Sequence, residues 1–318
     1  MKKLALLWCA IMVATAVLAQ PTKPINTTDK SLELKNGKIC VKQDLTRGGA
    51  IYFIADAGSE HNLVNIYDEG RYIQQSYYAG RSLDRRAEGQ ADVWSPWTWN
   101  PIQVGDNAYN RAEILEQWQK GNTTYVKCIP MQWDLNNVPA EAVMEQWTTL
   151  NGRVIKVRNR LTCHRTDDLY GEGIIRQQEI PAVWLISALK NLYAYFGDKP
   201  FKGDKIESTE VKQLIMNDPA HFWGQYPNVS EKWMAFVDDS LYGCAVYSPT
   251  ATEFLAGRYD SFLEGDEHHV ASSYIAPLRY EALMKNSVVE YEYYLIIGTL
   301  EQIRKEIYKI KNKTDRKQ

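Results

Sequence analysis

Residues 143–163 read VMEQWTTLNGRVIKVRNRLTC, and this stretch decides the fold class. In its second half, Ile155, Val157, Asn159 and Leu161 alternate with Val154, Lys156, Arg158 and Arg160. A period of two is typical of a β-strand with one buried face. Asn151-Gly152 separates the two strand-like runs, and both residues tolerate the positive φ of a tight turn. The stretch therefore predicts an antiparallel hairpin that turns at Asn151-Gly152.

The chain from residue 31 onward has the same strand-and-turn character. A second hairpin is predicted from 232–237 and 244–247, and further strands from 32–34, 39–44, 50–55, 124–133 and 288–297. Residues 181–196 are apolar nearly all round, which fits either a buried helix or a buried strand pair. Thr299 and Gln302 form a capping-box pattern ahead of Leu300, Ile303 and Ile307, so we expect a C-terminal helix of about three turns.

These patterns predict a mainly all-β fold, a large antiparallel β-sandwich with a short C-terminal helix. The expected organisation is a signal peptide at 1–19, a flexible leader at 20–30, a single sandwich domain at 31–311 and a solvated tail at 312–318. The signal peptide is indicated by Lys2-Lys3, an apolar run to Leu18 and compact residues before Gln20. We therefore expect an exported protein, periplasmic or extracellular, with no membrane insertion once this segment is cleaved.

Composition narrows the function classes. The chain of 318 residues has 37 basic and 39 acidic side chains, and removal of Lys2 and Lys3 would change the formal charge from −2 to −4. This balance argues against a nucleic-acid partner. Cys40, Cys128, Cys163 and Cys244 form no metal-binding spacing, so we expect buried free thiols, with one disulfide as the alternative. We expect neither a metal nor another cofactor.

Three stretches are poor core material and rich in side chains that bind sugars. The chain has 10 Trp and 20 Tyr but only 7 Phe, and rings with a polar edge suit partly wet binding surfaces. Residues 62–78 form the first stretch, with Asp68, Arg71, Gln74, Gln75 and Tyr77. If this stretch is extended, Gln75 and Tyr77 share one face and Gln74 the other. The alternative is a polar loop braced by an Arg71–Asp68 ion pair.

Residues 94–106 and 170–181 are the other two stretches. The first of these is interrupted by proline and supplies Trp97, Trp99, Asn100, Gln103 and Asp106. Its alternative role is to close one end of the core. Residues 170–181 supply Glu172, Arg176 and Glu179. Glu179 precedes an apolar run, and partial burial there would raise its pKa, as a general acid requires. Its alternative role is an ion pair with Arg176. His221 near Trp223 is a weaker candidate that also fits a structural role.

Two groups of segments carry a resemblance to known proteins. Residues 45–54, with Asn62-Leu-Val-Asn65, resemble the start of a galactose-mutarotase-like β-sandwich. Residues 176–183 and 233–239 resemble exported Bacteroidetes-type carbohydrate-active proteins of no defined family. The mutarotase resemblance implies a sugar site on a concave sheet face, with a His acid and a Glu base. The signature Asn-x-x-x-His-x-Tyr-Trp of that family is absent, so no catalytic residue is carried over.

The combined hypothesis is an exported carbohydrate-active enzyme, a glycoside hydrolase acting on a poly- or oligosaccharide through two carboxylates. Glu179 is the expected acid and Asp68 its partner, with Asp106 and Glu172 in reserve. The expected substrate contacts are Arg71, Gln74, Gln75, Tyr77, Trp97, Trp99, Asn100, Gln103, Asp106, Glu172, Arg176, His221 and Trp223. The alternatives are a polysaccharide lyase, with Arg71 or Arg176 neutralising a uronate, and a non-catalytic glycan-binding protein. The hypothesis requires the three stretches to meet at one cleft.

Overall fold

The hairpin predicted from residues 143–163 forms one centre of the fold. The computed structural model describes residues 30–68, 70–209, 213–214, 223–259 and 271–316. Strands β11 (Ala142–Asn151) and β12 (Val154–Cys163) pair antiparallel along their whole length. Asn151 pairs with Val154, so the turn consists of Gly152 and Arg153, one residue later than expected. Gly152 has a φ of 63°, which glycine adopts without steric cost.

A nine-stranded antiparallel sheet contains this hairpin. Its strand order is β15-β14-β18-β19-β22-β12-β11-β9-β8. The other members are β8 (Glu113–Lys120), β9 (Thr123–Ile129), β14 (Asn191–Ala194), β15 (Glu207–Thr209), β18 (Trp233–Val237), β19 (Tyr242–Tyr247) and β22 (Val288–Thr299). The second predicted hairpin is therefore present as β18 and β19, which pair directly.

An eight-stranded sheet forms the second layer, in the order β10-β7-β4-β13-β21-β20-β16, with β17 also paired to β20. Its strands are β4 (Gln74–Ser76), β7 (Pro101–Ile102), β10 (Met131–Gln132), β13 (Arg176–Ile186), β16 (Gln213–Leu214), β17 (Gly224–Tyr226), β20 (Glu253–Tyr259) and β21 (Ser272–Glu281). The predicted apolar stretch 181–196 is thus extended, but its strands β13 and β14 belong to different sheets.

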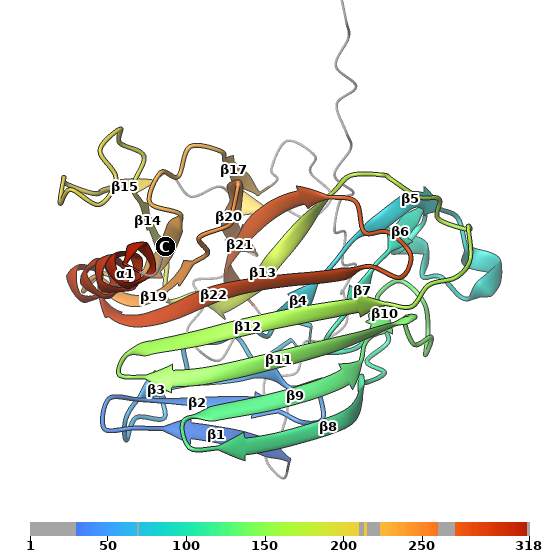
Figure 1. Ribbon diagram of the computed structural model, residues 1–318, viewed down its shortest axis with the longest axis horizontal. Helices are drawn as coiled ribbons and strands as arrows, with labels where there is room; N and C mark the ends of the chain where they lie inside the picture. Colours follow the sequence, from blue (N-terminus) through green and yellow to red (C-terminus); the bar gives the residue numbers. More distant parts are fainter. Residues whose placement is uncertain (1–29, 69, 210–212, 215–222, 260–270, 317–318) are drawn as a thin grey trace, which may run out of the picture.

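Smaller elements complete the sandwich (Figure 1). Strands β1 (Ser31–Lys35), β2 (Ile39–Asp44) and β3 (Ala50–Asp56) form a three-stranded sheet, and β5 (Ala79–Leu83) pairs with β6 (Trp97–Trp99). Two short 3₁₀ turns, η1 (Arg86–Glu88) and η2 (Asp92–Trp94), lie between β5 and β6. The main core joins residues of both large sheets, such as Val157 and Leu295 from one and Ile180 and Val183 from the other. The mainly β sandwich predicted from the sequence is confirmed.

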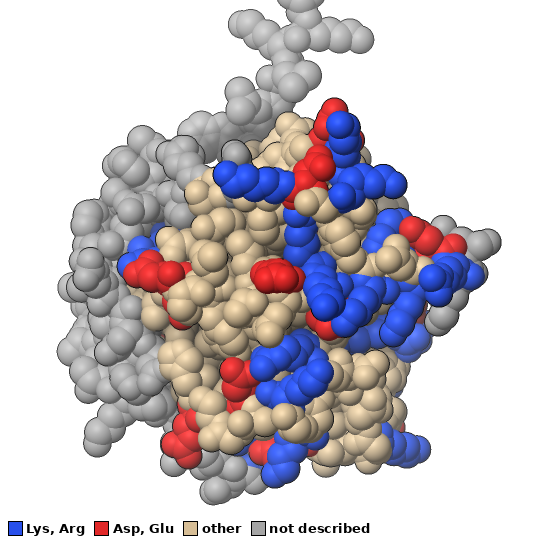
Figure 2. Space-filling model, turned by 90° about the vertical axis from the view of Figure 1, so that its left-hand side faces the viewer, with Lys and Arg blue, Asp and Glu red and all other residues tan. Residues whose placement is uncertain are grey.

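The helix α1 (Leu300–Asp315) covers one end of the nine-stranded sheet (Figure 1). Thr299 and Gln302 make the expected capping box, and Leu300, Ile303 and Ile307 are buried. The helix continues to Asp315, into residues expected to form a tail. Lys and Arg side chains gather on the side of the molecule that carries this helix, with carboxylates among them (Figure 2).

Glu231 holds α1 against the sheet. Its side chain is fully buried and accepts hydrogen bonds from Trp233 Nε1, Tyr308 Oη and both Arg304 Nε and Nη2. Burial alone would raise the pKa of Glu231, but these donors outweigh it, and the pKa lies below its usual value. The carboxylate is therefore ionised in the folded state.

A row of rings crosses the outer face of the nine-stranded sheet near its β8 edge. Trp118, Tyr125 and Trp147 are cross-strand neighbours, with ring centroids 5.1 and 5.0 Å apart. The Arg158 guanidinium lies 3.9 Å above the Trp147 ring, and Lys120 Nζ lies 5.3 Å from the Trp118 ring. The pairing of β8 with β9 shifts register between Ile114 and Glu116. The row therefore fastens an irregular edge strand to the sheet.

All four cysteines after residue 30 are free thiols, and Cys128, Cys163 and Cys244 are buried while Cys40 is partly exposed. Among the described residues, no helix is long and apolar enough to span a membrane.

Glu231→Ala should destabilise the protein by about 3–5 kcal/mol, because it leaves Arg304, whose side chain is only 12% exposed, without its carboxylate partner. Urea unfolding would measure the loss. Glu306→Ala, which removes only a surface pair with Lys309, should cost less than about 1 kcal/mol. The Glu231 contribution should be complete above the usual pKa of glutamate and decline as pH falls through the lowered folded-state pKa. Equal losses in the two variants would contradict this role.

Candidate functional site

A pocket opens on the face of the eight-stranded sheet that points away from the nine-stranded sheet. On β13, Val183 and Leu185 point into the main core, whereas Ala182 and Trp184 point to the outer face. Its empty volume is about 680 Å³, which includes the open solvent at its mouth. It is lined by Asp68, Gly70, Arg71, Gln74, Ser76, Trp94, Asn100, Ile102, Trp133, Glu179, Ala182, Trp184, Trp223 and Tyr259.

A β-bulge on β13 brings Glu179 into this pocket. Glu179 pairs with Ser76 and Ala182 pairs with Gln74, so three steps on β13 match two on β4. The extra residue lets Glu179 and Ala182 share the pocket face, although strict alternation would separate them. Pro181 lies inside the bulge, where a missing backbone N–H is tolerated.

Hydroxyl groups surround the Glu179 carboxyl. Tyr274 Oη donates a hydrogen bond of 2.5 Å to Glu179 Oε1, and the hydroxyls of Ser76 and Tyr78 also reach the carboxyl. Burial raises the pKa of Glu179, and the three hydroxyls lower it by a smaller amount, so that the net shift is upward. Glu179 is thus a carboxyl that holds its proton at higher pH than an exposed glutamate does.

Arg71 is fixed in the pocket wall by an ion pair and by stacking. Its Nε lies 2.7 Å from Asp68 Oδ2, and its Nη1 donates to Ser272 Oγ at 3.3 Å. The guanidinium lies 3.9 Å from the Tyr259 ring centroid and 4.9 Å from that of Trp184. The ion pair that the sequence offered as an alternative is therefore present, and it lies inside the pocket.

Aromatic rings form two groups in the pocket wall. Trp94 and Trp133 meet edge to face at 5.5 Å. Trp184 and Trp223 meet edge to face at 5.9 Å, and the Tyr274 ring packs against both of them, at 4.3 and 4.9 Å. The pocket lining therefore combines aromatic rings with polar side chains that include Glu179.

The structure brings together residues from all three predicted stretches. Six of the predicted site residues line the pocket, namely Asp68, Arg71, Gln74, Asn100, Glu179 and Trp223. The side-chain amide of Asn100 bonds other parts of the protein: it accepts a hydrogen bond from Trp97 Nε1 and donates one to the Tyr77 carbonyl. Gln74 likewise bonds the backbone of Gly70 and Val104.

Three predicted contacts lie in the core between the sheets instead. Gln75 and Tyr77 are fully buried, and Tyr77 Oη donates to Gln75 Oε1 at 2.8 Å. Gln103 accepts from the Gln75 backbone and donates to Gly48 O and Gln146 Oε1. The prediction that these three residues contact a sugar is therefore wrong. Each side chain is buried, and its polar atoms bond other parts of the chain.

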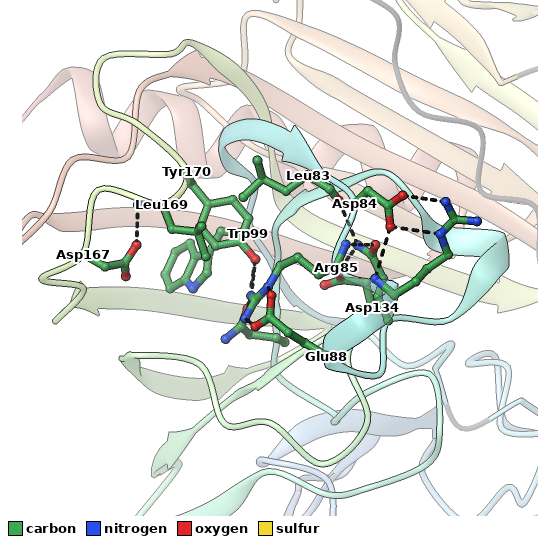
Figure 3. Close-up of polar contacts among 12 residues, drawn as sticks. Leu83, Asp84, Arg85, Glu88, Trp99, Asp134, Asp167, Leu169 and Tyr170 are labelled. Atoms are coloured by element: carbon green, nitrogen blue, oxygen red, sulfur yellow. Dashed lines mark hydrogen bonds and ion pairs between the residues drawn. The ribbon is translucent and has the colours of Figure 1, made fainter.

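Trp97 and Trp99 are also buried away from the pocket lining. Trp97 packs against Trp94 at 5.0 Å and Tyr78 at 6.4 Å. Trp99 is fully buried near Tyr170, and Arg85 close by bonds Glu88 and Tyr170 (Figure 3). Trp99 belongs to the main core, which agrees with the alternative role of this stretch, closing one end of the core. The expected stacking on a sugar ring is not available to either tryptophan.

The other predicted residues serve local structure or fall outside the described chain. Asp106 is buried and accepts from the backbone of Ala108, Asn110 and Asn137. Glu172 accepts from the Lys285 backbone, and Arg176 donates to the Gly80 carbonyl. None of these three lines the pocket. His221 lies outside the described residues.

Sequence reasoning did not select several lining residues. Trp94 and Ser76 belong to the quoted stretches, and Ser76 shares the strand face of Gln74 as alternation predicts. Trp184 and Tyr259 come from strands β13 and β20, and Trp133 comes from the turn that follows β10. None of the three has a local sequence signal for a ligand-facing role. The described residues contain no group of three or more His, Cys, Asp or Glu side chains that could hold a metal ion.

Comparison with known proteins gives a fold but no family. No family model matches the sequence, and neither does any curated protein. A galactose mutarotase related enzyme from Lactobacillus acidophilus is similar in structure, with a TM-score of 0.50, 8% identity, and coverage of 85% of this chain and 98% of that chain. A galactose mutarotase-like protein from Lactobacillus casei has a TM-score of 0.49 at 8% identity, with 85% and 100% covered. The chain therefore has a galactose-mutarotase-like fold.

Gln103→Leu should destabilise the protein by about 2–3 kcal/mol, because it leaves Gly48 O and the Gln75 N–H buried without partners. Thermal and urea unfolding would measure this effect. Gln117→Leu, on the exposed strand β8, is the matched control and should change stability by no more than about 0.5 kcal/mol. A neutral result for Gln103→Leu would argue that this side chain is a surface contact after all.

Proposed function

We propose that this protein is an exported carbohydrate-active enzyme, a glycoside hydrolase with Glu179 as its general acid. The observation that carries the proposal is a single carboxyl with a raised pKa in a pocket whose lining includes aromatic rings. A general acid for glycosidic cleavage has to be protonated near the working pH, and partial burial produces that state. Export is supported by the N-terminal sequence of residues 1–19.

Glu179 would donate its proton to the glycosidic oxygen as the bond between that oxygen and the anomeric carbon breaks. Positive charge then develops on the sugar ring, and a second carboxylate stabilises it or activates water. Asp68 is the second carboxylate of the pocket lining and is held by Arg71 at 2.7 Å. Water supplies the hydroxyl group of the product, and its other proton restores Glu179.

The pocket walls suit a sugar ring. The C–H face of a pyranose is apolar and packs on aromatic rings, which Trp94, Trp184 and Trp223 supply. The fold likeness to a protein described as a galactose mutarotase related enzyme agrees with a sugar ligand, although likeness at this identity concerns the fold alone.

A lyase for acidic polysaccharides is less well supported. Such an enzyme needs a cationic group for the substrate carboxylate, and the charge of Arg71 is already matched by Asp68. A lyase would release an unsaturated product that absorbs ultraviolet light, which a hydrolase does not. The assay that detects activity therefore also separates the two reactions.

Glu179→Gln should reduce turnover about 10²–10⁴-fold and leave saccharide affinity within a few-fold of the original value, because the amide keeps the shape but has no acidic proton. A polysaccharide screen with product analysis would find the substrate, and calorimetry would measure affinity. The matched control is Glu290→Gln, on the outer face of the other sheet, which should retain full turnover. Undiminished turnover in Glu179→Gln would refute the acid assignment, and binding without turnover in the unmodified protein would favour a glycan-binding protein.

The pH profile should follow the protonation of Glu179. Activity should fall as pH rises through its pKa, because the ionised carboxylate cannot donate a proton. Since burial raises this pKa, the fall should begin at higher pH than an ordinary glutamate would give. Initial rates across a pH series would check this, and a fall centred on the usual glutamate pKa would contradict it.

A further inference from the structure

Tyr274 has no place in the sequence-based hypothesis, yet its hydroxyl makes a short hydrogen bond to the Glu179 carboxyl. Its hydroxyl donates to Oε1 at 2.5 Å from the neighbouring strand β21. The side chain is 1% exposed and packs against both Trp184 and Trp223. Because its ring is in contact with both tryptophans, which also contact each other, the hydroxyl is held beside the carboxyl.

The two oxygens of Glu179 are therefore not equivalent. Oε1 is occupied by the tyrosine hydroxyl, which as a donor disfavours a proton on the same oxygen. The proton of the neutral acid is therefore assigned to Oε2. The hydroxyls of Ser76 and Tyr78, which also reach the carboxyl, can each donate or accept a hydrogen bond, so they are compatible with a proton on that oxygen. An acid that can present its proton from only one oxygen is oriented before substrate binds, and such orientation contributes to rate.

We propose that Tyr274 is a positioning residue that directs the transferable proton of Glu179 to Oε2 and stabilises the carboxylate formed when that proton leaves. The inference rests on the proposed function of Glu179 as a general acid. As the proton moves to the glycosidic oxygen, negative charge grows on the carboxyl, and the tyrosine hydrogen bond becomes charge-assisted and stronger. An interaction that is stronger in the transition state than in the ground state raises the rate of the chemical step.

The test is Tyr274→Phe, which keeps the ring packed against the two tryptophans and removes only the hydroxyl. The pKa of Glu179 should rise by about one unit, since the lost hydrogen bond favoured the charged form. The infrared carboxylic-acid band that disappears in Glu179→Gln reports this pKa without any substrate. Turnover should fall about tenfold with KM nearly unchanged, and the alkaline limb of the pH profile should move upward with the pKa.

Tyr242→Phe is the matched control. Its hydroxyl donates to Asp56 Oδ2 at 2.6 Å, so this variant also removes a tyrosine–carboxylate hydrogen bond, but far from the pocket lining. This control variant should change neither the pKa of Glu179 nor the pH dependence of turnover. Thermal unfolding of both variants would show that each is folded.

The outcomes separate the two proposals. A raised Glu179 pKa in the unmodified protein that stays the same in Tyr274→Phe would overturn the role of Tyr274 and leave the acid assignment intact. An ordinary Glu179 pKa that nevertheless rises in Tyr274→Phe would refute the general acid and support the tyrosine contact. A tenfold loss of turnover with no movement of the pKa or the pH profile would mean that Tyr274 acts through packing alone, which also contradicts the proposal.

Discussion

Buried polar side chains between the two sheets must find partners inside the protein, and this constraint organises the molecule. Gln75, Gln103 and Gln146 bond one another and nearby backbone across the interface of the sheets. An amide left unpaired there would cost more than the bond itself contributes. The short strands β4 and β7 have only three and two residues, so these amides, and not long hydrogen-bonded ladders, hold them in place. The pocket lining depends on the same strands.

Because side chains alternate along a strand, one short strand contributes both to the core and to the pocket. On β4, Gln75 points into the sandwich, and Gln74 and Ser76 point to the pocket. On β13 the bulge changes the alternation once, which puts Glu179 on the pocket face beside Ala182. The pocket thus lies on the outer face of the eight-stranded sheet, and the glutamine side chains on the inner face of the same sheet stabilise it. Its chemistry follows from burial, since the same enclosure raises the pKa of Glu179.

The sequence predicted the mainly β class, both hairpins, several further strands and the capped helix, because local alternation and turn residues report them directly. Strands β8, β20 and β21 were not predicted. The sequence also selected Asp68, Arg71 and Glu179, which line the pocket. It failed for Gln75, Tyr77, Gln103 and Trp99, because amides and polar-edged rings satisfy a buried network as well as they bind a sugar. It could not find Tyr274 or Trp184. These two residues are 90 positions apart in the sequence and become neighbours only because β13 pairs with β21.

The edge strand β8 closes the larger sheet in an instructive way. Its register shift, its charged residues Glu113, Glu116 and Lys120, and the ring row that begins at Trp118 leave few evenly spaced backbone groups for another chain. A second molecule that approached sideways would meet charge and an irregular ladder. Strand β8 therefore disfavours pairing with a further strand at this edge. The nine-stranded sheet is, at this edge, a poor template for fibril growth.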